Sequence, residues 1–397
     1  MTFTLATLLY SIGKLFGIIG FLLLTLLIFS GDTARFWNKW VGLDKMIKFQ
    51  RKFSYFVAFF VIFHPVFFML SNESTKGFLF PDFAYTPLAA GIIAMYIFIG
   101  VMIASKLYKL ISYRVWQYIH ILTYVLFFFA LYHGINAGSD SDDSGLIFII
   151  AGIVIIIGII YRTQYKIRER KTGKFLVKSV IKKTHDTFTL TVSGHKDFFA
   201  GQFFFLRLNK NKLYARHPFT ISSKPGDDMS FTMKLAGRFT QTAKDLKAGE
   251  EVLIDGPFGN FIPKPEKDLV FIAGGVGITP FMSILGDRVN KNINQNITLI
   301  YGSRTEADII FKKEIDTIDK PWFKKVYLLS QAEDNAIMST DCEKGFICKD
   351  ILDRYVKDIK NSLYYICGPE KMKNNAKKLL KDEGVRGGQM FVEDFFW

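Results

Sequence analysis

Three of the six histidines in this 397-residue chain, His64, His120 and His133, lie inside long runs of apolar residues. An ionisable side chain is costly in hydrocarbon and therefore points to a function. A neutral imidazole is a common axial ligand of haem iron, and haem fills an apolar helix bundle well. One such histidine could simply bond a neighbouring helix, but three on two helices favour haem. These residues are therefore the candidate iron ligands.

The spacing of these histidines sets their depth in a membrane. His120 lies six residues after Arg114, about 9 Å along a helix, and His133 lies thirteen residues further, about 20 Å deeper. This separation suits two haems stacked across a bilayer, although on an ideal helix the two side chains point about 140° apart. Either the helix is locally irregular or the haems have different azimuths. Spacing alone allows His64 to pair with either partner.

Five apolar segments must position these side chains, and most approach the ~20 residues that a bilayer requires. They cover Leu5–Phe29, Phe53–Leu70, Pro87–Ala104, Val115–Ile135 and Leu146–Tyr161. We therefore expect a multi-pass membrane protein, with the lipid bilayer as its partner, and exclude a wholly soluble or disordered chain.

The chain carries 51 Lys and Arg against 36 Asp and Glu, a formal charge of +15. The cations concentrate in residues 30–52 and 105–114 and directly after the fifth apolar segment, whereas the loops 71–86 and 136–145 are poor in them. Because basic loops stay in the cytosol, we expect residues 162–397 there and the other two loops outside. This topology accounts for the excess of positive charge, so we expect no nucleic-acid partner.

Beyond the last apolar segment the pattern becomes β-rich, in short stretches such as Lys174–Ile181, and predicts an antiparallel barrel. Further along, buried strands such as Asp268–Ala273 alternate with helical or loop segments, which predicts an α/β sheet. The expected multi-domain membrane protein has an α-helical haem-binding bundle over residues 1–165, an antiparallel β-barrel over 172–264 and an α/β nucleotide-binding domain over 265–397.

A glycine turn follows the first strand of the predicted α/β domain, in the sequence Gly274-Gly275-Val276-Gly277-Ile278-Thr279-Pro280. Glycines let backbone N–H groups approach a pyrophosphate, and the following helix contributes its dipole. Glycine at a strand-to-helix turn can also be plain geometry. The strand before the turn and the helix after it favour nucleotide binding.

The tetrad His217-Pro218-Phe219-Thr220 closes a strand of the predicted barrel. An aromatic ring there can stack on a flavin while a neighbouring hydroxyl reaches a ring nitrogen, and Arg216 or His217 can face phosphate. An ordinary strand end is the alternative interpretation.

Four motifs occur in a fixed order: His217–Thr220, Asp255-Gly256-Pro257-Phe258-Gly259, Gly275–Pro280 and Cys367-Gly368-Pro369-Glu370. Together they resemble the dehydrogenase half of the NADPH oxidase and ferric reductase superfamily, itself similar to ferredoxin–NADP reductases. The histidine pair of the fourth apolar segment resembles the fifth helix of the same superfamily. The resemblance covers nearly the whole chain, whose form is similar to compact bacterial NADPH oxidases.

The resemblance implies two flavin-binding segments. One of them lines the FAD with Pro218, Phe219 and Thr220 and brings His217 to its phosphates. The other, Gly237-Arg238-Phe239-Thr240, resembles the second pyrophosphate-binding turn of the FAD domain, with Gly237, Arg238 and Thr240 as its binding residues.

The resemblance also implies a nicotinamide nucleotide site. The glycine turn would hold the nucleotide through Gly275, Gly277, Thr279 and Pro280. The resemblance places Cys367 near the nicotinamide, with Gly368 and Pro369 shaping the pocket. Ser303 and Arg304 follow a strand where the family binds the adenosine 2′-phosphate, and an arginine there favours NADPH. A solvated arginine is the alternative.

Relatives end in an aromatic residue that stacks on the flavin and moves aside for the nicotinamide. Trp397 is the first candidate for this lid and Phe395 the next, and packing for stability is the alternative. The expected catalytic residues are thus Cys367, Trp397, Phe395 and Thr220.

The superfamily has four haem histidines, whereas the apolar segments here have three. Matching Phe49-Gln50-Arg51-Lys52 to the family's third helix places His64 at the outer ligand position and Gln50 at the inner one. The outer haem would then be held by His64 and His133, and His120 would have an unusual or missing partner. The pairing of His64 with His120 stays open.

The resemblance implies a membrane NADPH oxidase that passes electrons from cytosolic NADPH through FAD and two b-type haems to outer molecular oxygen, giving superoxide. A ferric chelate or an extracytoplasmic redox partner is an alternative acceptor. A haem-free anchor or channel is the non-enzymatic alternative. Since no regulatory extension or EF-hand loop is visible, we expect activity without an obligatory protein activator.

Overall fold

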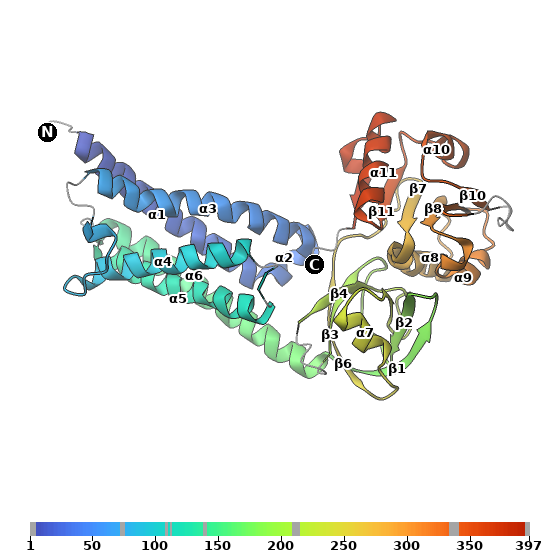
Figure 1. The fold of residues 1–397 in the computed structure, drawn as a ribbon, viewed down its shortest axis with the longest axis horizontal. Helices are drawn as coiled ribbons and strands as arrows, with labels where there is room; N and C mark the ends of the chain where they lie inside the picture. The colour runs from blue at the N-terminus through green and yellow to red at the C-terminus, as the bar shows by residue number, and fades with distance from the viewer. Residues whose placement is uncertain are drawn as a thin grey trace. The chain divides into compact units, whose positions relative to one another are not determined.

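The computed structural model describes residues 5–71, 76–107, 110–111, 113–137, 141–208, 215–332 and 341–393. The chain divides into two compact units, Met1–Arg168 and Glu169–Trp397 (Figure 1).

The first unit is helical, and five of its helices are long and apolar enough to cross a membrane. The helices are α1 (Leu5–Asp32), α2 (Ala34–Val41), α3 (Leu43–Ser71), α4 (Thr86–Lys106), α5 (Tyr113–Ala137) and α6 (Ser141–Thr172), with a single turn η1 (Lys76–Phe78). The five predicted apolar segments are confirmed as helices, although the helices extend into polar flanking residues. The short helix α2 was not predicted, because its residues belong to the basic loop.

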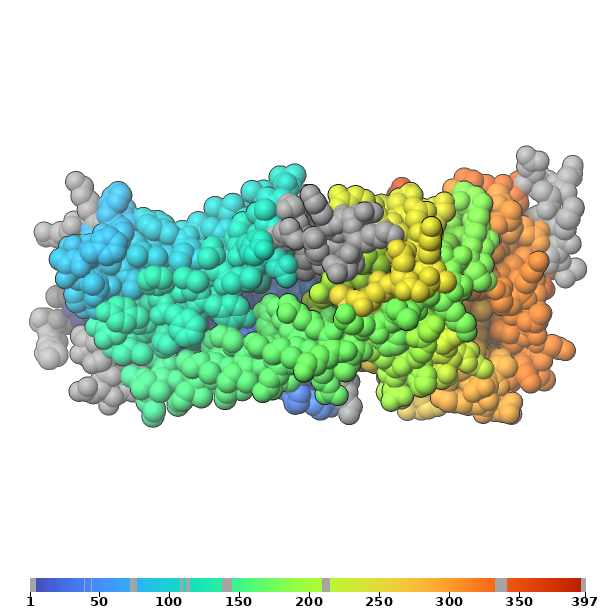
Figure 2. Space-filling model, turned by 90° about the horizontal axis from the view of Figure 1, so that it is seen from below, coloured from blue at the N-terminus to red at the C-terminus, as the bar shows by residue number. Residues whose placement is uncertain are grey.

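Aromatic packing joins the helices of this unit. The ring of Phe21 on α1 lies 5.2 Å from Phe127 on α5 and 5.0 Å from Phe148 on α6. The helices α4, α5 and α6 lie side by side on the face of the unit seen in Figure 2. Large apolar side chains such as Ile149 and Ile153 are exposed on α6, as expected where helices face lipid.

A charged cluster ties three of the helices together. Asp32 at the end of α1 has a side chain only 1% exposed, and its Oδ1 accepts hydrogen bonds from Tyr124 of α5 and from Arg162 Nη1 of α6, the latter at 2.9 Å. The same Arg162 nitrogen donates to the Tyr124 hydroxyl at 2.7 Å. A buried carboxylate needs such partners, since an uncompensated charge in an apolar interior is strongly unfavourable.

The first sheet of the second unit is antiparallel, in the strand order β4-β3-β6-β1-β2-β5. Its elements are β1 (Lys174–Lys182), β2 (Thr187–Val192), β3 (Phe203–Leu208), β4 (His217–Thr220), β5 (Ser230–Lys234), α7 (Arg238–Lys244) and β6 (Glu251–Phe258). The prediction of a barrel is wrong in one respect: the ladder is not closed. An isolated bridge joins Ile221, the residue after β4, to Phe231 of β5, but in the described residues it does not extend into a ladder between the two edge strands. The short β4 contains Pro218, which has no N–H to donate to a further ladder.

The second sheet is wholly parallel, in the order β10-β9-β8-β7-β11-β12, which confirms the predicted α/β sheet. Every residue of β7 is buried, as expected for a central strand covered on both faces. The strands are β7 (Leu269–Gly274), β8 (Ile297–Ser303), β9 (Phe323–Leu329), β10 (Cys342–Lys344), β11 (Leu363–Cys367) and β12 (Met390–Val392). Between them lie η2 (Gly275–Ile278), α8 (Thr279–Asn290), η3 (Glu306–Asp308), α9 (Lys312–Asp316), α10 (Lys349–Tyr355), α11 (Glu370–Asp382) and η4 (Gly387–Gln389).

The substitution Arg162→Ala should destabilise the membrane unit, because it leaves the Asp32 carboxylate buried with one partner fewer. We expect a loss of about 2 kcal/mol in the free energy of unfolding, below the value for a fully enclosed pair since Arg162 is partly exposed. Denaturant unfolding in detergent micelles measures the change. Adding Asp32→Asn should restore part of the loss, and a double variant as unstable as the sum of both single variants would contradict this explanation.

Candidate functional site

The parallel sheet has a topological switch point beside β7. The chain passes from β7 to β8, β9 and β10 on one side and returns with β11 on the other. Ligands of open α/β sheets bind beyond the carboxyl ends of the strands at such a point. Ala273 of β7 lies beside Cys367 of β11, and Gly274 lies beside Gly302 of β8. The sheet thus brings the glycine turn, the segment after β8 and the Cys367 turn to one edge.

Two glycines permit the close backbone approach at this edge. A Cβ atom at Gly277 would lie 2.3 Å from the carbonyl oxygen of Cys367. A Cβ atom at Gly368 would lie 2.6 Å from Met372 Cε and 3.0 Å from the Cα of Gly274, and its φ of +156° also favours glycine. The turn after β7 and the turn after β11 therefore contact each other directly, backbone against backbone.

Several other predicted nucleotide-binding residues lie at or just before the start of a helix. Thr279 and Pro280 are buried in the first turn of α8, and Pro369 immediately precedes α11. Gly275 has a φ of +52°, and nothing lies within 4 Å of the position of a Cβ atom there. The helix N-terminus and the open face of Gly275 suit an anionic ligand, as expected for a dinucleotide pyrophosphate.

Tyr301 of β8 supports this turn and was not predicted from the sequence. Its hydroxyl donates to the carbonyl oxygen of Gly275 at 3.0 Å and accepts from the N–H of Ile310 at 3.1 Å. Burial raises the pKa of Tyr301 above its usual value, so the hydroxyl stays protonated and can donate. Only the sheet register reveals this contact, because 26 residues separate Tyr301 from Gly275.

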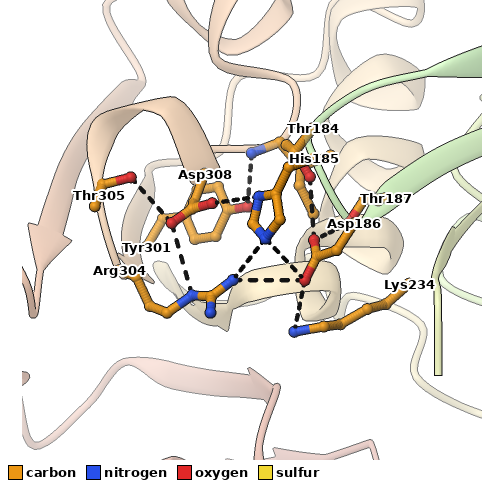
Figure 3. A network of polar contacts seen from close by, with 10 residues as sticks. Thr184, His185, Asp186, Thr187, Lys234, Tyr301, Arg304, Thr305 and Asp308 are labelled. Atoms are coloured by element: carbon orange, nitrogen blue, oxygen red, sulfur yellow. Dashed lines mark hydrogen bonds and ion pairs between the residues drawn. The ribbon is translucent and has the colours of Figure 1, made fainter.

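Ser303 ends β8, and Arg304 follows it as predicted. Arg304 is partly exposed and also contacts two carboxylates. Its Nε lies 3.6 Å from Asp308 Oδ2, and its Nη2 lies 3.5 Å from Asp186 Oδ2, a residue of the antiparallel sheet's β1–β2 turn (Figure 3). No sequence pattern indicates the contact with Asp186, which lies 118 residues earlier in the chain.

The tetrad predicted to line a flavin forms the edge strand β4. Phe219 stacks on Phe239 at 5.5 Å between ring centroids, and His217 lies 4.3 Å from the same ring. Thr220 is 3% exposed, and its hydroxyl has no hydrogen-bond partner in the described part of the chain. A buried hydroxyl without a partner fits an absent polar ligand atom, as a flavin ring would supply. Phe239 belongs to the predicted pyrophosphate-binding turn, but the packing of its ring against His217 and Phe219 was not predicted.

The two candidates for a phosphate contact near β4 have different surroundings. Burial lowers the pKa of His217, which favours the neutral ring, and a neutral ring can still donate a hydrogen bond. Arg216, the other candidate, donates to Asp255 Oδ2 at 3.1 Å.

The turn with Gly237, Arg238 and Thr240 begins the short helix α7. The Thr240 hydroxyl accepts from the N–H groups of Ala236 and Gly237 at 3.0 and 3.2 Å, and donates to the Gly237 carbonyl at 3.0 Å. Thr240 therefore shapes the turn through its own hydrogen bonds. The helix places Phe239 next to this turn, against the rings of β4.

In the membrane unit, the structure brings His64 of α3 against His133 of α5. The ring centroids lie 6.2 Å apart, with 72° between the planes. Two imidazoles bonded at about 2 Å to opposite sides of one metal ion have centroids roughly 6 to 7 Å apart. His64 Nδ1 lies 2.7 Å from the Gly13 carbonyl and His133 Nδ1 lies 2.9 Å from the Pro87 carbonyl. When each Nδ1 carries its proton, each Nε2 keeps the lone pair that an iron ligand needs.

A glycine beside each ring makes these hydrogen bonds possible. A Cβ atom at Gly17 would lie 2.6 Å from the His64 ring, and one at Gly91 would lie 2.7 Å from the His133 ring. Each glycine comes four residues after the residue whose carbonyl accepts the bond, one helical turn away. The rings therefore lie directly on the backbones of α1 and α4, and this repeated arrangement fits axial ligation of a haem.

His120 has different surroundings. Its ring stacks on Trp116 at 4.9 Å and 15°, and Gln50 donates from Nε2 to Ser30 Oγ at 3.0 Å. The imidazole that faces His133 belongs to His64, which favours the outer pairing over the pairing of His64 with His120. The predicted lid residues Phe395 and Trp397 lie outside the described residues.

The substitution Gly277→Ala should push the two turns of the nucleotide edge apart, because the new Cβ would overlap the Cys367 carbonyl. We expect a loss of about 1–3 kcal/mol in the free energy of unfolding of the second unit, together with weaker nucleotide binding. Thermal unfolding and nucleotide titration measure the two effects. Gly387→Ala is the control, since nothing lies within 4 Å of its Cβ position. Equal stability of the two variants would contradict the close approach.

Comparisons with known proteins agree with this arrangement. Residues 7–131 match a family described as a ferric reductase like transmembrane component. Residues 173–261 match an FAD-binding domain, and residues 271–378 match an oxidoreductase NAD-binding domain.

Relatives include one subunit of the Na(+)-translocating NADH-quinone reductase of Idiomarina loihiensis, 32% identical over 44% of this chain and 43% of that protein. The same subunit of Pasteurella multocida is 29% identical over 40% of each chain. The chain thus matches less than half the length of these relatives. The FAD/NAD-binding domain of a Vibrio cholerae nitric oxide dioxygenase shares the fold of the second unit, with a TM-score of 0.50, 19% identity and coverage of 56% of this chain and 98% of that chain. Together the family matches support a membrane, flavin-dependent NAD(P)H oxidoreductase with a ferric reductase-like transmembrane component.

Proposed function

We propose that this protein is a transmembrane NAD(P)H oxidase that passes electrons from a cytosolic nicotinamide nucleotide through FAD and b-type haem to oxygen at the outer face. The observation that carries this proposal is the pair His64 and His133. Their rings lie 6.2 Å apart, and each ring is fixed by a backbone carbonyl in a segment that matches a ferric reductase-like family. A structural histidine would need a hydrogen bond, but not a second imidazole at the spacing of axial ligands.

Within this proposal the second unit handles the nucleotide and the flavin. When bound, FAD accepts a hydride and releases single electrons, and haem iron carries single electrons. The glycine turn and α8 would bind the pyrophosphate, and the turn at Cys367 would hold the nicotinamide. Thr220 would bond the flavin ring through its unpartnered hydroxyl, next to the rings of Phe219 and Phe239.

Within the membrane unit, His64 and His133 would hold the outer haem. A second haem would use His120 with a partner other than histidine, since Gln50 stands where the superfamily has the inner ligand. By the positive-inside rule the basic loops and the second unit would lie in the cytosol, so electrons would move outward.

The acceptor is the least constrained part of the proposal. Oxygen needs no binding surface of its own, and its one-electron reduction gives superoxide. A ferric chelate or an extracytoplasmic redox protein would need contacts on the outer loops. The relatives named as NADH-quinone reductase subunits match less than half of this chain. The electron acceptor of those relatives is therefore a further alternative and not the first choice.

The histidine pair predicts a specific pattern of haem loss. His64→Ala and His133→Ala should each remove the same haem, so the double variant should lose no more than either single variant. Haem content by the pyridine haemochromogen method and the reduced-minus-oxidised b-type spectrum measure this. His195→Ala, an exposed histidine of the second unit, is the matched control and should keep full haem content.

Two outcomes would contradict this pattern. A purified protein without any b-type spectrum would exclude the haem relay. Full haem retention in His133→Ala, with loss in both His64→Ala and His120→Ala, would instead establish the pairing of His64 with His120.

The proposed acceptor predicts that NADPH- or NADH-driven reduction of cytochrome c is largely abolished by superoxide dismutase, because free superoxide carries the electrons. Heat-inactivated dismutase is the control. Reduction that is insensitive to the active dismutase would overturn superoxide release and favour direct transfer to a chelate or protein acceptor.

A further inference from the structure

A polar network surrounds the arginine expected to recognise the 2′-phosphate of NADPH (Figure 3). His185 and Asp186 come from the turn between β1 and β2, and Lys234 ends β5. Arg304 and Asp308 come from the segment after β8. The two sheets of the second unit, one matching an FAD-binding domain and the other an NAD-binding domain, thus meet at one guanidinium group.

Asp186 is fixed within its own turn before it contacts Arg304. Its Oδ1 accepts from the hydroxyls of Thr184 at 3.2 Å and Thr187 at 3.1 Å. Its Oδ2 lies 3.1 Å from Lys234 Nζ and 3.5 Å from Arg304 Nη2. Burial opposes its ionisation, but the bonds from Lys234 and Thr187 hold the pKa of Asp186 below its usual value. The carboxylate is therefore charged and oriented at neutral pH.

Asp308 holds the other side of the same guanidinium. Its Oδ2 accepts from the Thr305 hydroxyl at 3.0 Å and lies 3.6 Å from Arg304 Nε. Its Oδ1 lies 3.0 Å from His185 Nδ1, and His185 Nε2 lies 3.3 Å from Arg304 Nη2. His185 Nε2 also lies 3.6 Å from Asp186 Oδ2, so the imidazole contacts both carboxylates as well as the guanidinium. Two carboxylates and one imidazole nitrogen thus share the guanidinium.

The charges of this network decide what it can bind. Arg304 and Lys234 are balanced by Asp186 and Asp308, so these four side chains together carry no net charge. A 2′-phosphate would bring about two negative charges to a site where two carboxylates already lie within 4 Å of the arginine. A ribose 2′-hydroxyl brings no charge and can donate to a carboxylate, as in NAD-binding sites.

We propose that Asp186, a residue of the flavin-binding sheet, determines nucleotide specificity by occupying Arg304 and so removes the preference for NADPH that an arginine at this position would otherwise give. This proposal rests on the proposed function, because it requires the nicotinamide nucleotide to bind at the edge beyond β8. Wild-type protein then binds NADP⁺ no more tightly than NAD⁺. Because the ion pairs of Arg304 are partly exposed, a single change of charge can reverse this balance.

The test is isothermal titration of the detergent-solubilised full chain with NAD⁺ and with NADP⁺, neither of which can donate a hydride. Asp186→Asn should tighten NADP⁺ binding about three- to tenfold, with NAD⁺ changed less than about twofold. Asp186→Glu keeps the charge and should resemble wild type. In the Arg304→Ala background, Asp186→Asn should have no such effect, because the released guanidinium is then missing.

Asp228→Asn is the matched control, since Asp228 pairs with Lys178 elsewhere on the same sheet. Equal FAD content and thermal unfolding temperature in Asp186→Asn and wild type show that the network is not required for folding. If both dinucleotides bind and the ratio of their affinities is the same in Asp186→Asn and wild type, the inference is overturned while the proposed function stands. If neither dinucleotide binds, both are overturned.

Discussion

An imidazole buried among apolar helices needs an acceptor for its protonated nitrogen, and His64 and His133 both find that acceptor in a backbone carbonyl of the neighbouring helix. A helical carbonyl is already bonded within its helix, so a second donor can reach it only where no side chain covers it. Gly17 and Gly91, one turn beyond the accepting residues, provide that opening. The same bonds fix the tautomer of both rings, so the proposed haem site depends on two glycine positions as much as on the histidines.

The nucleotide edge relies on the same constraint in a different setting. Gly277 brings the turn after β7 against the carbonyl of Cys367, and Gly368 brings the turn after β11 against Gly274. In the membrane unit the absence of a Cβ atom lets a histidine ring reach the backbone. At the nucleotide edge the absence of a Cβ atom lets one backbone segment contact another. In both cases the candidate site lies where a glycine replaces a side chain, so that a ligand or a histidine ring can reach backbone polar groups.

The sequence predicts what depends on local pattern. The strand expected over Asp268–Ala273 is observed as β7, Leu269–Gly274, one residue further along, and the five apolar segments correspond to five helices of the described residues. Both were predictable because burial on both faces and helix length are visible in composition. Closure of the barrel was not predictable, since it depends on whether the edge strands β4 and β5 pair. The partner of His64 and the contact of Asp186 with Arg304 also depend on packing between distant segments, which no residue spacing encodes.

Two arginine–carboxylate contacts in this chain show why similar pairs have different roles. Asp32 is almost fully enclosed, so the loss of Arg162 would leave a buried charge with one partner fewer, and the pair stabilises the packing of the helices. Asp186 and Arg304 are partly exposed, with side chains 24% and 48% accessible, and water can replace either partner at small cost. If the carboxylates around Arg304 bound it as strongly as Asp32 binds Arg162, a phosphate could not displace them. Recognition of a ligand by Arg304 therefore requires that its resting partners bind it weakly, and those partners, rather than the arginine alone, set the specificity.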